Sequence, residues 1–518
     1  MILTVQGLIT AYKLRPEVGT DDAEITHAYA RNIAEGVGYV YNVGGEHVEG
    51  STSLLWTLLN VPFFLVSDTP FIGLFCFAFI LTGAILMMII GIARFVVPHV
   101  TDRHIRTGLF VASLAFPSMF GWLLWSLLDV TLWVFWITAS ALISLALLTN
   151  RCPRSRAFSL IALWAVLPLV RPEGSFVVCL LACAMVVASP AADRRARARI
   201  AGLGVLGAAL TLAIATAWRL AYFGMPFPNT YYAKARGDLR AQLLEGIRYV
   251  AGFLTWGPVT VALVLAALVA VTSVWLRGQS PLIPRAGAFT AICVLGLLAL
   301  YAGLGGDHFA GFRLLLPSIT LVLPFILAGF AYVMHGIQGD PARQLPPPKR
   351  RILLVSVGAL AGLAVAPPGI RFLDDGDNMA VEYAVADTGR HVGSVLAREY
   401  NGDSPSIGIV AAGGIRMTYP GEIKDLVGLN WVEMAHAPRE ATQRPAGHLA
   451  FNSTVFWSSP PELMLPRVAS CDEDQFVANP LLGEIFGELL TSDEFRSAYE
   501  FRCTDDIAYF ALREEPTG

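Results

Sequence analysis

The sequence predicts a polytopic α-helical membrane protein with about 11 spans and a C-terminal extracytoplasmic α/β domain. Of its 518 residues, 55% are hydrophobic and only 15% are charged, whereas about 25% are charged in a soluble domain. Apolar runs of at least roughly 17 residues, enough to cross a hydrocarbon core, recur from about residue 71 to about 368. The last part of the chain has no such run. We therefore expect a membrane domain over 1–369 and a soluble domain over 370–518.

The expected spans follow the apolar runs in order. They are 1–17, 71–93, 107–125, 130–149, 157–170, 175–190, 200–222, 252–276, 286–304, 314–336 and 352–368. The segment Ser51 to Val66 is apolar but would break the alternation of loops as a full span. We expect it to form a short helix in or dipping into the outer interface.

Basic residues set the expected orientation. They gather in alternate loops between the spans, such as Arg194 to Arg199 and Lys349 to Arg351. By the positive-inside rule these loops face the cytoplasm, so the other loops and the tail face outward. The net charge is −3, and no broad basic surface favours nucleic acid as a partner.

The tail predicts a compact α/β fold. Ser406 to Ala412 is a strand-like run closed by Gly413-Gly414, and Leu482 to Leu490 has helical periodicity. Cys471 and Cys503 lie in this polar region, away from the apolar runs. If the tail is exported, they are candidates for a disulfide.

The first outer loop, residues 18–70, begins with the acidic pair Asp21-Asp22. Two carboxylates at a membrane surface can bind a divalent cation, or one can take a proton from an attacking sugar hydroxyl. The alternative is a helix N-cap, a position that aspartate favours.

The same loop continues with turn formers, carboxylates and aromatic residues, a composition that suits sugar binding. The candidates there are Asn42, Glu46, His47, Glu49 and Trp56. The alternative is an ordinary surface turn followed by an interfacial helix. That alternative explains the glycines but not two carboxylates, a histidine and a tryptophan beside lipid.

Three cations fall on the outer side. Arg171 and Lys234 belong to polar segments beside spans, and Arg313 begins a span. Each is either part of a salt bridge or a contact for a charged ligand. Together they would suit the phosphate of a polyprenyl carrier. Further candidates for sugar or acceptor binding share this side: Asp129, which has helix capping as its alternative, Glu173, Asn229, Tyr231, Tyr232, Asp307 and His308.

These motifs, in this order, resemble the GT-C superfamily of membrane glycosyltransferases, and within it the mycobacterial arabinofuranosyltransferases that add terminal β-arabinofuranose to cell-wall arabinan. The resemblance is most specific from Asp21-Asp22-Ala-Glu-Ile-Thr-His to Thr57. It extends to Arg-Pro-Glu-Gly, Pro-Asn-Thr-Tyr-Tyr-Ala-Lys, Gly306-Asp307 and Asp425-Leu-Val-Gly-Leu-Asn430. The chain departs from the family's pattern at Ser126 to Val130 and in its shorter N-terminus.

The resemblance implies an outward-facing pocket in which Asp21 or Asp22 is the catalytic carboxylate. The donor would be a polyprenyl-phosphate sugar, with arabinofuranose as the expected sugar, and the acceptor a cell-envelope glycan or glycoprotein. The enzyme would cross the bilayer of a bacterial cytoplasmic membrane many times, with its site and tail outside. The sequence establishes no cofactor, and a divalent cation stays an open alternative. The alternative, a transporter or flippase of a polar lipid, predicts ionisable groups deep in the spans and an internal repeat, and the sequence shows neither.

Overall fold

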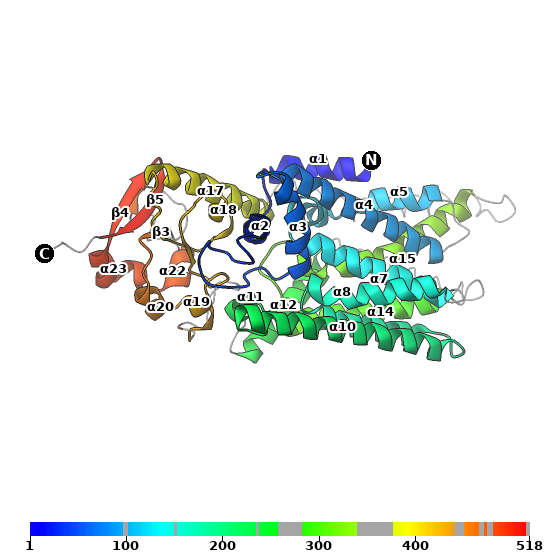
Figure 1. Ribbon diagram of the computed structural model, residues 1–518. Helices are drawn as coiled ribbons and strands as arrows, with labels where there is room; N and C mark the ends of the chain where they lie inside the picture. Colours follow the sequence, from blue (N-terminus) through cyan, green and yellow to red (C-terminus); the bar gives the residue numbers. More distant parts are fainter. Residues whose placement is uncertain are drawn as a thin grey trace. The chain divides into compact units, whose positions relative to one another are not determined.

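The computed structural model (Figure 1) describes most of the chain. The described residues are 1–96, 102–149, 153–234, 238–256, 282–338, 377–438, 440, 450–465, 471–473 and 480–513. They pack into two compact units. The first comprises Met1–Arg15, Phe75–Ile214 and Leu239–Ala380, and the second comprises Pro16–Leu74, Ala215–Asp238 and Val381–Gly518. These units reflect packing within the chain, so the expected membrane and exported domains stay a prediction.

The first unit is a bundle of helices, in which α9 packs on α14, α14 on α12, and α7 on α8 and α15. Its elements are α1 (Ile2–Leu14), α4 (Phe71–Val96), α5 (Asp102–Ser113), α6 (Pro117–Phe120), η1 (Gly121–Trp125), α7 (Val130–Thr149), α8 (Arg154–Val170), α9 (Gly174–Ala188), α10 (Arg194–Phe223), α12 (Leu239–Thr255), α14 (Leu282–Leu304), η2 (Arg313–Leu315) and α15 (Leu316–Gln338). The first residues of α4 and the last of α10 belong to the second unit.

Several of these helices are long and apolar enough to span a membrane. Among the described residues there are five: Phe71–Val96, Val130–Leu148, Arg194–Phe223, Pro284–Leu304 and Arg313–Ala331. At 1.5 Å per residue, a helix of 20 residues covers about 30 Å. At the other expected spans, the helices that the structure describes are shorter or bent. The expected spans 252–276 and 352–368 lie largely or wholly outside the described residues. The total of about 11 spans stays a prediction.

The expected span 107–125 is broken. Its two parts, Asp102–Ser113 and Pro117–Trp125, meet at 92°. Pro117 has no backbone N–H and disfavours the helical conformation of the residue before it. Phe116 accordingly has φ −126° and ψ 50°. The expected span is therefore two helices that meet at a sharp bend.

The second unit joins the first loop to the tail. From the loop come α2 (Asp21–Ala34) and α3 (Leu54–Val66), the latter a short helix as expected. The remaining elements are α11 (Asn229–Lys234), α17 (Asp377–Glu399), β1 (Ile407–Ile409), α18 (Gly413–Arg416), β2 (Ile423–Asp425), α19 (Val432–His436), α20 (Ser453–Ser458), β3 (Leu463–Leu465), α22 (Pro480–Phe486), η4 (Leu489–Thr491), α23 (Asp493–Ala498), β4 (Tyr499–Thr504) and β5 (Ile507–Leu512).

The tail has the expected α/β architecture. Its five strands lie in the order β2-β1-β3-β5-β4, with β1 parallel to β2 and β3, and β5 antiparallel to β3 and β4. The expected disulfide between Cys471 and Cys503 is confirmed, with the two Cα atoms 5.7 Å apart. It ties the segment before α22 to β4.

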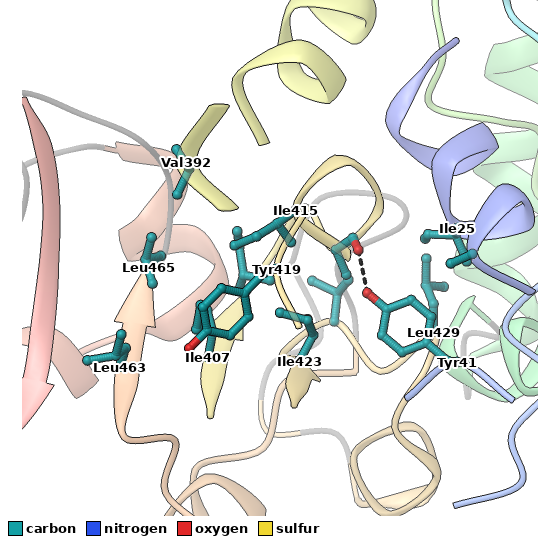
Figure 2. Packing of buried hydrophobic residues seen from close by; sticks show 14 of the residues in the cluster. Ile25, Tyr41, Val392, Ile407, Ile415, Tyr419, Ile423, Leu429, Leu463 and Leu465 are labelled. Atoms are coloured by element: carbon teal, nitrogen blue, oxygen red, sulfur yellow. Dashed lines mark hydrogen bonds between the residues drawn. The ribbon is translucent and has the colours of Figure 1, made fainter. Parts of the chain in front are cut away.

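One hydrophobic core contains residues of both the first loop and the tail. Figure 2 shows Ile25 and Tyr41 from the loop packed into the same cluster as Ile415 and Ile423 from the tail. The Tyr41 hydroxyl also donates a hydrogen bond to the Ala412 carbonyl. Because burying such side chains contributes about 1.5–3 kcal/mol each, the loop and the tail stabilise one another.

Candidate functional site

The acidic pair begins helix α2. Thr20 takes the N-cap position with extended backbone, and Asp21, Asp22 and Glu24 fill the first turn. Carboxylates are favourable there because the helix dipole places partial positive charge at this end. The alternative in which an aspartate is the N-cap is therefore not observed.

Asp21 is held by the backbone of the tail. Its Oδ2 accepts a hydrogen bond from the N–H of Gly413 at 3.0 Å, and its Oδ1 accepts one from the N–H of Gly414 at 2.8 Å. The residue is only 8% exposed. Burial raises the pKa of Asp21 to about 7, although the two N–H groups act in the opposite direction and the charges of Asp22 and Glu24 add to the rise.

Asp22 has a different environment. Its carboxylate lies 3.9 Å from the Lys234 ammonium, and the two side chains are 26% and 35% exposed. Lys234 ends α11, which is fixed at its beginning by Asn229. The Asn229 side chain donates to the carbonyls of Gly428 at 2.8 Å and Leu429 at 3.1 Å. The expected sites on the first loop and on Lys234 are thus brought together.

A buried charge cluster fastens α2 to α17. Glu24 accepts from Arg390 Nε at 2.6 Å and pairs with His27 Nδ1 at 2.9 Å. Glu24 and His27 have fully buried side chains, and the Arg390 guanidinium lies 4.4 Å from the centre of the Phe71 ring. The cluster fixes the first turn of α2, which carries the acidic pair.

The tail motif Asp425 to Asn430 also reaches the first loop. Asp425 accepts hydrogen bonds from the backbone and side chain of Asn430 at 3.0 and 2.9 Å. The Tyr29 hydroxyl donates to Asn430 Oδ1 at 3.0 Å and to the Val48 carbonyl at 2.9 Å. This motif therefore positions the loop around α2.

Most of the expected sugar-binding residues of the first loop make internal contacts. Glu49 pairs with Arg219 through two bonds of 2.6 and 2.9 Å, and both side chains are buried. Trp56 is 1% exposed. Asn42 accepts from the Ile423 N–H and donates to the Ile423 carbonyl, both at 3.0 Å.

Other candidates lie nearer the surface of the second unit. Glu46 accepts from the Val432 N–H at 2.9 Å, and His47 stacks on Tyr222 with ring centres 4.4 Å apart. Tyr232 packs on His436. Tyr231 is 55% exposed, which makes it the most accessible of the expected aromatic contacts.

The first unit holds the remaining charged candidates in ion pairs. Arg171 contacts Asp129 at 2.8 Å and Glu173 at 2.6 Å, with all three side chains largely buried. Of the two alternatives for Arg171 and Glu173, the structure shows a salt bridge. The Tyr301 hydroxyl lies 3.4 Å from Glu173.

A second pair in this unit joins Asp307 and Arg313 at 2.6 Å, and His308 lies 3.6 Å from Asp307. The Arg313 guanidinium is 3.8 Å from the centre of the Phe309 ring. Arg171 and Arg313 therefore have different ion-pair partners, and the convergence of these two arginines and Lys234 on one phosphate stays a prediction.

Sequence reasoning missed the groups that hold the carboxylates. Gly413, Gly414 and Arg390 orient the first turn of α2, and Arg219 neutralises Glu49. The Gly-Gly pair after a strand was a signal for a special backbone site, but nothing in it identified Asp21 as the partner. Within the described ranges, no group of three or more His, Cys, Asp and Glu residues is arranged to hold a metal ion.

No protein-family model matches the chain. The chain is 30% identical over 353 residues to the terminal β-(1→2)-arabinofuranosyltransferase of Corynebacterium glutamicum, a match that covers 62% of this chain and 49% of that protein. The chain thus matches about half the length of this relative.

Two solved structures share the architecture along nearly the whole chain. ArnT from Cupriavidus metallidurans bound to undecaprenyl phosphate superposes with a TM-score of 0.59 at 12% identity, covering 98% of this chain and 97% of that one. Its apo form gives 0.53 at 12% identity, with 98% and 96% covered. The chain has the fold of ArnT. The GT-C-type helical membrane fold and the resemblance expected from the sequence are confirmed.

Proposed function

We propose that this protein is a glycosyltransferase that moves a sugar from a polyprenyl-phosphate donor to a hydroxyl of a cell-envelope glycan or glycoprotein. Arabinofuranose is the proposed sugar, because the relative is named for it. The lipid phosphate is proposed because the similar ArnT structure holds undecaprenyl phosphate. The observation that carries the proposal is the pair of adjacent aspartates with different environments beside Lys234.

Asp21 is the proposed general base. A base works best when its pKa lies near the working pH, and the pKa of Asp21 is raised to about 7. In an inverting transfer, the acceptor oxygen forms a bond to the anomeric carbon while the bond from that carbon to the phosphate oxygen breaks. The acceptor proton passes to Asp21, and polyprenyl phosphate leaves with the bonding electron pair.

Lys234 is the proposed first contact for the leaving phosphate. Its ammonium is partly exposed and lies 3.9 Å from Asp22, so Asp22 can orient it toward the donor. Placing a cation where negative charge develops lowers the barrier. Two neighbouring carboxylates would then have separate tasks set by their surroundings.

Arg171 and Arg313 remain proposed further contacts for the donor phosphate. Arg171 already pairs with two carboxylates and Arg313 with Asp307. A phosphate would have to share or displace these partners, so we expect Lys234 to contribute more to donor binding. Tyr231 is the proposed acceptor contact that needs no rearrangement, because it is exposed.

The outer face of a bacterial cytoplasmic membrane is the proposed location of the site. Arginine-rich loops lie on the opposite side of the expected topology. The disulfide between Cys471 and Cys503 supports an exported tail, because disulfides persist in oxidising compartments.

The test is transfer from synthetic polyprenyl-phosphate arabinofuranose to a short glycan acceptor by purified protein in detergent. Wild type is compared with Asp21→Asn and Asp22→Asn. We expect Asp21→Asn to lower kcat by roughly 100-fold to 10,000-fold, the usual range for removing a general base, with donor binding retained. We expect Asp22→Asn to act mainly on donor KM.

Product with another polyprenyl-phosphate sugar, but not with arabinofuranose, would change the proposed sugar. Folded wild-type protein that yields no product with any such donor would overturn the transferase and favour the transport of a polar lipid.

A further inference from the structure

The first turn of the short helix α18, at Gly413 and Gly414, contacts a carboxylate 392 residues before Gly413 in the chain. Its two consecutive N–H groups each donate to a different oxygen of Asp21. Both partners belong to the second compact unit and lie beside the core that the loop and tail share.

We propose that this turn is the positioning element of the catalytic carboxylate, fixing the orientation of Asp21 for proton transfer. The inference rests on the proposed function, since it assigns a role within that same site. It makes the tail a working part of the catalytic apparatus, rather than an attached binding module.

The geometry leaves Asp21 able to react. An ionised carboxylate oxygen has two lone pairs, and the turn engages one on each oxygen. The other lone pair of either oxygen can accept the proton of an incoming hydroxyl. With both oxygens tethered, the carboxylate plane cannot rotate freely, so the orientation is set before the substrate binds.

The turn is itself held on both sides by the first loop. Before it, the Ala412 carbonyl accepts from the Tyr41 hydroxyl. After it, the Arg31 guanidinium donates to the carbonyls of Arg416 at 3.1 Å and Met417 at 3.0 Å. These bonds fix the turn against α2 and the first loop.

Glycine is required at the contact. A Cβ atom on residue 413 would lie 1.8 Å from the carbonyl oxygen of Asp21, and one on residue 414 would lie 2.1 Å from the carbonyl oxygen of Ala386. Both neighbours are backbone atoms, which cannot turn aside. Any larger residue at 413 must therefore push the turn away from Asp21.

The charged surroundings of Asp21 are contributed by several elements. Asp22 and Glu24 lie on its own helix, and Tyr41 comes from the first loop. Each of these neighbours has charged groups of its own. Lys234 pairs with Asp22, and Arg390 pairs with Glu24. The charges that influence Tyr41 include Arg31, Arg416 and Asp425.

The first experiment compares Gly413→Ala with Gly483→Ala, whose added Cβ meets no atom within 4 Å. We expect Gly413→Ala to lower kcat by roughly 100-fold, as a displacement of about 1 Å can, with donor KM unchanged. Gly483→Ala should match wild type. Combining Gly413→Ala with Asp21→Asn should lower kcat little further than Asp21→Asn alone, because both changes act on one group.

The pH profile separates positioning from general loss of structure. The base must be deprotonated, so activity rises as pH passes upward through the pKa of Asp21, about 7. Displacing the turn weakens N–H bonds that lower this pKa and also reduces the burial that raises it, so the acidic limb of the Gly413→Ala profile should move away from that of wild type. An unmoved limb, or fully additive losses in the double variant, would overturn the proposal.

A second measurement needs no activity. Hydrogen exchange of the Gly413 and Gly414 amides should be faster in Asp21→Ala than in wild type, whereas Asp22→Ala should leave it unchanged. Unchanged exchange in Asp21→Ala would refute the contact. Absence of product from wild type, with this exchange effect present, would refute the proposed function while leaving the contact intact.

Discussion

The two units hold their charged residues in different ways. In the first unit, Arg171 pairs with Glu173 two residues away and with Asp129 42 residues away, and Arg313 pairs with Asp307 six residues away. In the second unit, Asp21 and Glu24 take partners 392 and 366 residues distant. Pairs within one loop need only that loop, whereas the contacts of Asp21 and Glu24 need the tail in place. The second unit should therefore be more sensitive to changes far from the candidate site.

The largest effect should come from the distant pair of Arg219 and Glu49. Arg219→Ala leaves a buried carboxylate without its bidentate partner, which costs about 3–5 kcal/mol of unfolding free energy. Denaturation in detergent measures it. The double variant Glu49→Gln with Arg219→Met should lose less, because no charge remains buried. If Arg219→Ala lost less than about 1 kcal/mol of unfolding free energy, this distant contact would stabilise the protein no more than a surface ion pair does.

Removing the disulfide should cause the second largest loss of stability. Cys471 and Cys503 are 32 residues apart, and closing a loop of that size contributes about 2–4 kcal/mol. Cys471→Ser should lower stability by that amount and abolish the sensitivity to reducing agent. Cys76→Ser, at an exposed free cysteine of the first unit, is the control. Equal stability of the two variants would contradict a stabilising role for the bridge.

Lys234→Gln should have an intermediate effect on binding. Losing one charge-assisted contact to phosphate costs about 1.5 kcal/mol or more, which corresponds to a donor KM at least roughly 10-fold higher. Arg398→Gln removes a positive charge from an exposed position of the same unit and should leave KM unchanged. If both variants raised KM equally, general electrostatic attraction would replace the specific contact.

The smallest effect should be at Arg502 and Glu500, a pair two residues apart on β4 with largely exposed side chains. Water and salt screen such a pair, so Arg502→Ala should change stability by less than about 1 kcal/mol. A larger loss would mean that distance along the chain does not decide which contacts of this unit matter.

Hydropathy predicted the helical membrane architecture because lipid constrains composition strongly. It also located α3 and the α/β tail. It did not predict the break before Pro117, where apolar residues continue through the bend and conceal it. For Arg171 and Glu173, a salt bridge was one of the two alternatives that the sequence offered, because the two residues are neighbours in the sequence.

The candidate site was only partly predictable. The sequence identified Asp21 and Asp22 as a pair, but the two side chains are chemically identical, so nothing in the sequence distinguished their roles. The difference arises from burial and from backbone N–H groups, which every residue except proline possesses. Glu49 and Trp56 were expected to contact sugar because carboxylates accept hydrogen bonds from hydroxyl groups and aromatic faces cover sugar rings, yet tertiary packing buries both residues.

The second unit is built from segments that lie far apart in the chain, so the order in which they are synthesised affects when it can fold. A ribosome that has made Asp21 and Asp22 must add nearly four hundred more residues before Gly413 and Gly414 emerge. At about 5–20 residues per second, the acidic pair waits at least roughly 20 seconds for its backbone donors. A nascent chain interrupted before β1 lacks Gly413 and Gly414, so Asp21 has no backbone donors from the tail until that part of the chain has been made and has folded.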